Sequence, residues 1–192
     1  MSVKKLVAVI APPESPRDAE GNWRAAEIVA GTEFPPDFRD LIGRYGSGEF
    51  FCGHLKLFNL LTLEGQAGIR QTLVIYQSFR TETYNPLPIP LHPERPGLLP
   101  WGMDENGSGY FWLTKGKPER WPIVYLGHAS EGFPVQLPVN VTTFLAGLAV
   151  DRFEKLARSN DPMTDELRVF TPARSQAEIA REWNKGRKNK KK

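Results

Sequence analysis

The stretch GTEFPPDFRDLIGRYGSG, residues 31–48, contains the clearest structural signal in the chain. It predicts a helix that begins at Pro35-Pro36-Asp37, because proline is tolerated in the first turn, where its missing N–H is not needed. Gly46 and Gly48 end this helix. Its apolar residues recur at the i, i+4, i+7 spacing of a single helix face, which predicts that this face is buried: Phe34, Phe38, Leu41, Ile42 and Tyr45.

The neighbouring segments predict a helix before this stretch and a strand after it. Residues 23–29 have a helix-forming composition, and Gly31 suits the end of that helix. A strand is expected over 51–57, because Phe51, Gly53, Leu55 and Leu57 alternate with Cys52, His54 and Lys56. Residues 62–80 predict a further helix, and the six prolines from Tyr84 through Pro100, with Pro100 included, then predict an extended loop.

The second half of the chain begins with a predicted hairpin. Its strands are expected over 98–103 and 109–113, joined by a tight turn, because Asn106 and Gly107 both tolerate positive φ. Trp101 and Trp112 are expected to be at least partly buried near this hairpin. A strand is expected over 121–126. A helix is expected to begin at Asn140, with these residues facing inward: Val141, Phe144, Leu145, Leu148 and Leu156. A last helix is expected to carry Ala177, Ala180 and Trp183, with a capping box formed by Ser175 and Glu178.

This order of elements predicts an α+β fold in which helices pack on an antiparallel sheet. One domain is expected over residues 1–170, followed by a C-terminal helix and a basic tail over 171–192. The net charge of +3 comes from that tail, because six of the last eight residues are Lys or Arg. The remaining 184 residues hold 19 basic and 22 acidic side chains, and the tail itself is expected to be disordered.

Composition also indicates where the protein works. Cys52 is the only cysteine, so no disulfide can form within the chain, which fits a reducing compartment. The apolar run 6–11 is short and stops at two prolines, unlike a signal peptide, and no run approaches the roughly 18 residues of a membrane span. A cytoplasmic protein without a membrane partner is therefore expected.

The motifs that could carry chemistry are weak. Residues 104–109 match the first half of a calcium loop, but Lys115 occupies the position where that loop needs a bidentate Glu. The three histidines do not have zinc-ligand spacing. A strand would place Cys52 and His54 on one face, which leaves a small hydrolase open as a hypothesis. We expect no catalytic residue, no metal site and no cofactor.

Several of these segments, taken in order, resemble the SUKH superfamily. The resemblance covers residues 20–156 and runs through a Trp-containing helix, a proline-initiated helix with a glycine-rich exit, and a central hairpin. The chain departs from the pattern at Phe34, at Ser47 and in the longer, proline-rich segment 60–97, and residues 157–192 lie outside it. The residues that carry the signature are Trp23, Pro35, Gly46, Gly48, Trp101, Gly102, Asn106 and Gly107.

The resemblance implies a function without catalysis. Members of this superfamily are chiefly immunity proteins of bacterial polymorphic toxin systems, which bind and neutralise a cognate protein toxin such as a nuclease. Asp104 and Glu105 are the candidate contact residues here, because the hairpin tip is expected to project them into solvent. The alternative function is a nucleic-acid-associated protein that uses the Lys-rich tail. The resemblance leaves the toxin and the oligomeric state open.

Overall fold

The computed structural model is an α+β protein, as predicted, and it describes residues 3–80, 87–127, 134–153, 163–175, 178 and 181. Its helices are α1 (Lys4–Val7), α2 (Trp23–Ala30), α3 (Pro36–Tyr45), α4 (Leu63–Arg80) and α5 (Val141–Leu148), with the short 3-10 turn η1 (Pro118–Arg120). Its strands are β1 (Gly48–Phe50), β2 (Leu55–Leu57), β3 (Leu98–Asp104), β4 (Gly109–Leu113), β5 (Ile123–Leu126), β6 (Val135–Leu137) and β7 (Phe170–Pro172).

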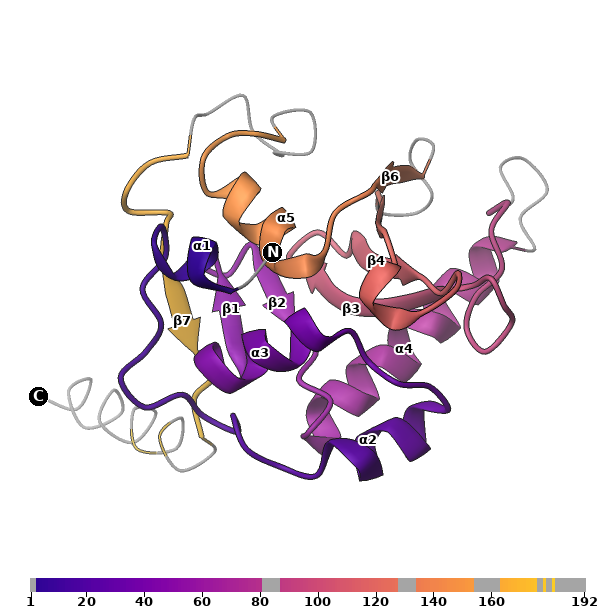
Figure 1. Ribbon diagram of the computed structural model, residues 1–192, viewed down its shortest axis with the longest axis horizontal. Coiled ribbons are helices and arrows are strands. Elements are labelled where there is room, and N and C mark those ends of the chain that lie inside the picture. The colour runs from indigo at the N-terminus through magenta and orange to yellow at the C-terminus, as the bar shows by residue number, and fades with distance from the viewer. Residues whose placement is uncertain are drawn as a thin grey trace, which may run out of the picture.

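The strands form one open antiparallel sheet in the order β6-β5-β4-β3-β2-β1-β7. Neighbours from β1 to β6 are also neighbours in the sequence, except that α4 and a loop separate β2 from β3. β7 arrives from the far end of the chain and pairs with β1, so that Thr171 lies opposite Glu49. Figure 1 shows α3 and α5 on one side of this sheet and α4 on the other.

The helix predicted from residues 31–48 is confirmed as α3. Pro36 is in its first turn, and Gly46 follows it with φ of 70°, where a side chain would collide with the backbone of Arg17. All five apolar residues predicted for its inner face are buried. The preceding helix is confirmed as α2, which Asn22 caps and Gly31 ends with φ of 66°.

The single strand predicted over 51–57 is wrong. The chain instead forms a hairpin, in which β1 and β2 are joined by the turn Phe51–His54. Phe51, Cys52 and Gly53 all have positive φ, so the backbone reverses where the alternating pattern predicted extension. The apolar alternation belongs to two short strands, and Phe50, Leu55 and Leu57 fill the core together.

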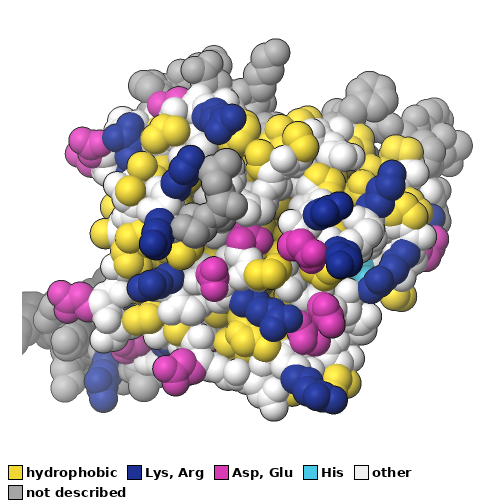
Figure 2. Space-filling model, viewed as in Figure 1, with side chains coloured by type: hydrophobic (Ala, Val, Ile, Leu, Met, Phe, Trp, Pro, Cys, Tyr) yellow, Lys and Arg dark blue, Asp and Glu magenta, His cyan; other side chains and the backbone are white. Residues whose placement is uncertain are grey.

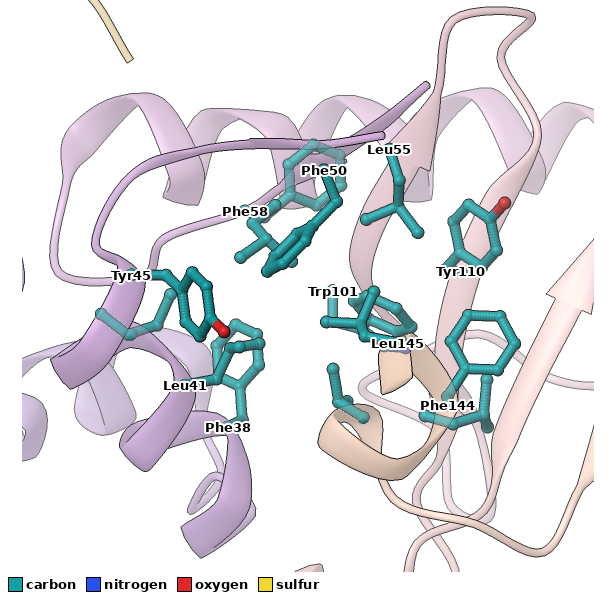
Figure 3. Packing of buried hydrophobic residues seen from close by; sticks show 14 of the residues in the cluster. Phe38, Leu41, Tyr45, Phe50, Leu55, Phe58, Trp101, Tyr110, Phe144 and Leu145 are labelled. Atoms are coloured by element: carbon teal, nitrogen blue, oxygen red, sulfur yellow. The ribbon is translucent and has the colours of Figure 1, made fainter. Parts of the chain in front are cut away.

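The main core lies between the sheet and helices α1, α3 and α5 (Figure 3). Trp101 is fully buried and Trp112 is 1% exposed, which confirms the expected burial. The ring of Trp101 packs 5.4 Å from Tyr110 of β4 and 6.0 Å from Phe144 of α5, measured between centroids. Trp112 continues this cluster to α3, because its ring meets Phe38 edge-on at 4.9 Å.

A β-bulge lies at Trp101. The register between β3 and β4 shifts between Pro100 and Gly102, so Trp101 is an extra residue on its strand. Because of this extra residue, the alternation of faces moves by one position after Trp101. Met103 therefore lies opposite Lys56 on the α4 side of the sheet, and Asp104 lies opposite the core residue Leu55.

The other face of the sheet is covered over β3, β4 and β5 by α4 and the loop 87–97. The Tyr76 hydroxyl of α4 is central to this layer. It accepts a hydrogen bond from the Gly109 amide (2.8 Å) and lies 3.3 Å from the carbonyl oxygens of Gly107 and Leu126, to which it can donate. This buried side chain thus joins the helix to the second half of the hairpin turn and to β5.

The loop 87–97 also holds the end of α2. His92 Nε2 donates to the carbonyl of Ala30 at 2.7 Å, while its Nδ1 is buried without a hydrogen-bond partner. Arg95 in the same loop donates to Thr32 at 2.8 Å. Burial lowers the pKa of His92, because a charged imidazolium would be poorly solvated there.

Several C-terminal expectations have mixed outcomes. The start of the helix from Asn140 is confirmed as α5, but this helix ends at Leu148, eight residues before Leu156. The Ser175–Glu178 capping box forms in both directions. The sheet includes β6 and β7, which were not predicted, and β7 crosses the domain boundary expected after residue 170. Leu156, Ala177, Ala180, Trp183 and the basic tail lie outside the described residues. In the described part of the chain, no helix has the length and apolar character needed to cross a membrane.

Replacing Tyr76 with Phe should lower the free energy of unfolding by about 1–3 kcal/mol. The buried Gly109 amide would lose its acceptor, and an unsatisfied buried polar group typically costs this much. Urea denaturation measures the change. Tyr125→Phe is the matched control, because Tyr125 is only partly buried, and it should change stability by less than Tyr76→Phe. Equal losses in the two variants would contradict this role for the Tyr76 hydroxyl.

The free energy of unfolding should also fall as the pH drops below about 6.5, the ordinary pKa of histidine. The folded state holds His92 with a lowered pKa, so in this window the unfolded chain binds more protons and is favoured. Thermal unfolding between pH 5 and 7.5 measures the trend. His92→Gln keeps a donor for Ala30 but does not titrate, so its stability should depend less on pH. Identical pH profiles would contradict the assignment.

Candidate functional site

The hairpin tip places the two predicted contact residues differently. Asp104 is only 4% exposed, so the expectation that it projects into solvent is wrong. Its Oδ1 accepts hydrogen bonds from the backbone amides of Asn106 and Ser108, each at 2.9 Å. The bulge at Trp101 turns this residue toward the core side, and the carboxylate then closes the tip in an Asx-type turn. Asp104 is a structural residue of the turn.

Glu105 is exposed, as expected. Its Oε1 lies 2.6 Å from Nδ1 of His54, and each side chain is about half exposed, at 51% and 47%. This side-chain contact connects the hairpin tip to the turn Phe51–His54. An exposed pair of this kind adds little to stability, so Glu105 is available for contact with a partner.

The turn Phe51–His54 does not bring Cys52 and His54 together in a pair. Cys52 Sγ donates to the carbonyl of Glu166 at 3.3 Å, whereas His54 contacts Glu105 from the other strand connection. The hydrolase hypothesis required both side chains on one strand face, and the structure places them in a turn with separate neighbours. The arrangement that this hypothesis predicted is therefore absent.

Residues 163–169 form the third segment at this end of the molecule. Glu166 touches the turn through its backbone and is exposed, and Asp165 is 93% exposed. Arg168 holds the segment in place, because it donates to the carbonyls of Ala149 (2.8 Å) and Met163 (3.0 Å) and pairs with Asp165 (2.5 Å).

Four acidic residues belong to the segments that meet at or next to this turn, and we name them together the acidic rim: Glu49, Glu105, Asp165 and Glu166. Glu49 belongs to it because its Oε2 lies 3.3 Å from where a side chain on Gly53 would begin. Sequence analysis found Glu105 alone. The other three come from segments up to 117 residues away along the chain, and only the pairing of β7 with β1 brings them together. Among the described residues, no three His, Cys, Asp or Glu side chains are grouped so that they could hold a metal ion.

A groove of about 500 Å³ adjoins the acidic rim on the α4 side of the sheet. Glu49, Lys56 and Met103 lie on its floor, and Glu64, Ala67 and Gln71 of α4 form a wall. Lys56 Nζ donates to Glu64 Oε1 across the groove at 2.8 Å, and this contact lowers the pKa of the Glu64 carboxyl. In the view of Figure 2, charged side chains of both signs are interspersed with apolar ones over the surface.

The residues on which the resemblance to the SUKH superfamily rests all have structural positions. The Trp23 ring packs beside Phe34 and Phe38 and lies under the guanidinium of Arg39, while Pro35 caps α3. A side chain on Gly48 would collide with β7, and one on Gly102 would approach the carbonyl of Lys56 to 2.8 Å. Asn106 and Gly107 form the hairpin turn beside Trp101. These residues hold the fold, and none belongs to the acidic rim.

Compared with protein-family models, curated proteins and solved structures, the chain shows no match.

Replacing Gly107 with Val should destabilise the protein by about 1–2 kcal/mol or more, because Gly107 has φ of 79° and a β-branched residue is strained there. Gly107→Asn is the matched control and should cost less, since asparagine tolerates left-handed backbone. Chemical denaturation of the two variants checks this. Equal stability of Gly107→Val and the original protein would contradict the turn geometry.

Proposed function

We propose that the protein is a non-catalytic, SUKH-like interaction protein that binds and neutralises a cognate protein toxin such as a nuclease. The acidic rim is the observation that supports this proposal most directly. A nuclease must bind phosphates, so its active-site surface is cationic, and the exposed carboxylates of Glu105, Asp165 and Glu166 complement it. Immunity by binding needs such a surface and needs no catalytic group.

The positions of the signature residues support the same proposal. Gly46, Gly48 and Trp101 allow close backbone approaches and fill the core, so the resemblance to the superfamily concerns its fold. Contact residues in an immunity protein must match one particular toxin, and here the exposed carboxylates lie outside the signature. This division is expected for a scaffold that presents a variable recognition surface.

The rim would act first on the rate of association. Charges on the edge of an interface steer the approach of a partner and change the on-rate more than the off-rate. Glu105 and Glu166 are suitable residues for the test, because both are exposed and neither side chain is needed for a buried contact. The alternative function through the Lys-rich tail is separated by removing residues 185–192, which should leave toxin binding intact.

Charge reversal in the double variant Glu105→Lys/Glu166→Lys should slow association with the toxin by about tenfold at low salt, and by less at high salt. The partner to use is a protein toxin encoded next to this gene in its genome, where a neighbouring gene encodes one, and stopped-flow fluorescence measures the rate. Glu119→Lys is the control, because Glu119 is exposed in η1, at the opposite end of β4 from the hairpin tip.

Thermal melting should show the double variant folded, since surface changes of this kind usually cost within about 0.5 kcal/mol. An unchanged on-rate at low salt would place the interface elsewhere. A toxin that does not bind the original protein at all would refute the proposed function.

A further inference from the structure

The basic tail, residues 185–192, is a part of the chain that the proposed function does not use. Six of these eight residues are Lys or Arg, and none is acidic. A block of like charge this dense repels itself and is attracted to an acidic surface within its reach. Two properties of the folded part of the chain therefore decide what the tail meets: where the tail is attached, and which acidic surface lies nearby.

The chain approaches the tail from the start of β1. Arg17 holds it there, because its guanidinium donates to the carbonyl of Ala173 at 3.2 Å and pairs with Glu178 at 3.4 Å. The carbonyl of Arg17 accepts a hydrogen bond from the amide of Ser47, and the carbonyl of Ser47 accepts one from Ala173. Ala173 and Glu178 are thus both anchored next to Ser47, the residue that precedes β1.

The acidic rim lies at the other end of the same strand. Ser47 precedes β1 and Phe51 follows it, so that four residues of extended chain, about 13 Å, separate them. The tail begins seven residues after Glu178 and ends fourteen residues after it. A flexible chain of this length has a root-mean-square span of about 13–22 Å. The tail can therefore reach the rim without any change in the fold.

The rim has the excess negative charge needed to bind the tail. Arg168 is the only Lys or Arg on the three segments that carry the rim, residues 48–54, 104–108 and 163–169. This guanidinium pairs with Asp165. Within the described residues, the other three carboxylates of the rim have no Lys or Arg partner.

The groove next to the rim does not cancel this excess. It adds one carboxylate, Glu64, and two cations, Lys56 and Arg174. Lys56 Nζ is bound to Glu64 at 2.8 Å, so Arg174 is the cation that the groove adds in excess. Rim and groove together therefore keep two more carboxylates than cations, and this part of the surface attracts a basic segment.

We propose that the basic tail docks on the acidic rim of the same molecule and masks it until a toxin displaces the tail. The inference rests on the proposed function, in which the same carboxylates meet the toxin. Contact within one molecule is favoured, because a short flexible linker holds the tail near the rim at an effective concentration of about a millimolar. A strongly cationic toxin displaces the tail and a weakly cationic protein does not, so the contact sharpens the choice of partner.

The first experiment needs no toxin, because Cys52 provides a labelling site beside the rim. Cys52 is exposed and is the only cysteine of the chain, so a nitroxide spin label can be attached there without a substitution. In NMR spectra of ¹⁵N-labelled protein at about 20 mM salt, the nitroxide should broaden the amide signals of residues 185–192. These signals should sharpen at about 500 mM salt, where charges are screened within a few ångströms.

Charge variants test which surface the tail meets. Glu105→Lys/Glu166→Lys reverses two charges of the rim and should abolish the broadening at low salt. Glu33→Lys/Glu119→Lys changes the net charge equally and is the matched control, because both residues are exposed and neither is on a segment of the rim. This control should keep most of the broadening.

Two further samples test the label and the contact between molecules. In Cys52→Ser/Glu119→Cys the label is at the opposite end of β4 from the hairpin tip and should leave the tail signals sharp. A mixture of spin-labelled ¹⁴N protein with unlabelled ¹⁵N protein should show much weaker broadening than the single sample. Thermal melting checks that the labelled protein is folded, since the label removes the hydrogen bond from Cys52 to Glu166.

The outcomes separate this inference from the proposed function. Sharp tail signals at low salt would overturn the contact between tail and rim. Broadening that persists in Glu105→Lys/Glu166→Lys, or that is equal in the mixed sample, would overturn it as well. None of these results bears on toxin binding, which the rate measurements of the preceding subsection decide independently.

The masking role is tested with the toxin. Replacing all six basic residues of the tail with glutamine should speed association about threefold at low salt, because the rim is then uncovered. The same replacements should have no effect on the rate at high salt. An unchanged rate at low salt would overturn the masking role, even where the NMR spectra show the tail on the rim.

Discussion

The bulge at Trp101 is the constraint on which the rest of the structure depends. It places the largest side chain of the core on β3, at the middle of the sheet, where it contacts β4 and α5 together. Truncating a buried tryptophan to alanine typically costs about 3–5 kcal/mol, a large part of the stability of a single domain. The packing of α3 and α5 against one face follows from this residue and from Trp112 beside it.

The same extra residue sets what lies on the other face. Without it, the strict alternation along β3 would carry Met103 to the core and turn Asp104 toward α4. With it, Asp104 is available to close the hairpin tip, and Met103 lies on the groove floor. The core, the tip and the groove are therefore linked through one local irregularity. A change in the register of β3 would disturb all three, because a slip by one residue exchanges the faces of a strand.

The sequence predicted the elements whose signals are local. The α3 helix has both its proline start and its glycine end within residues 31–48, and the hairpin turn has Asn106-Gly107. It did not predict the β1–β2 hairpin, because positive φ at Phe51 and Cys52 is imposed by tertiary contacts and these residue types do not favour it. β6 and β7 have three residues each, too few for a period of two to be recognised.

Of the residues in the candidate site, only Glu105 could be predicted from the sequence. Its turn could be predicted, and an exposed residue at a hairpin tip needs no further information. The prediction that Asp104 is exposed was wrong because a bulge leaves no pattern in a single sequence. Its carboxylate accepts hydrogen bonds from backbone amides of the turn and does not extend into solvent. Asp165 and Glu166 join Glu49 through pairing between β7 and β1, a contact across more than 110 residues. No local rule predicts a contact of that separation.

β7 is an edge strand of the sheet, and it contains a proline, Pro172, that cannot donate a hydrogen bond to a further strand. Val169 and Ala173 form backbone hydrogen bonds with Phe51 and Ser47, the residues on either side of β1. In this antiparallel register, Phe170 and Pro172 therefore direct their backbone groups to the outside. Proline has no N–H, and an incoming strand would therefore lack one of the donors that it needs for a continuous ladder. This edge resists the addition of a foreign strand and with it the edge-to-edge aggregation to which open sheets are prone.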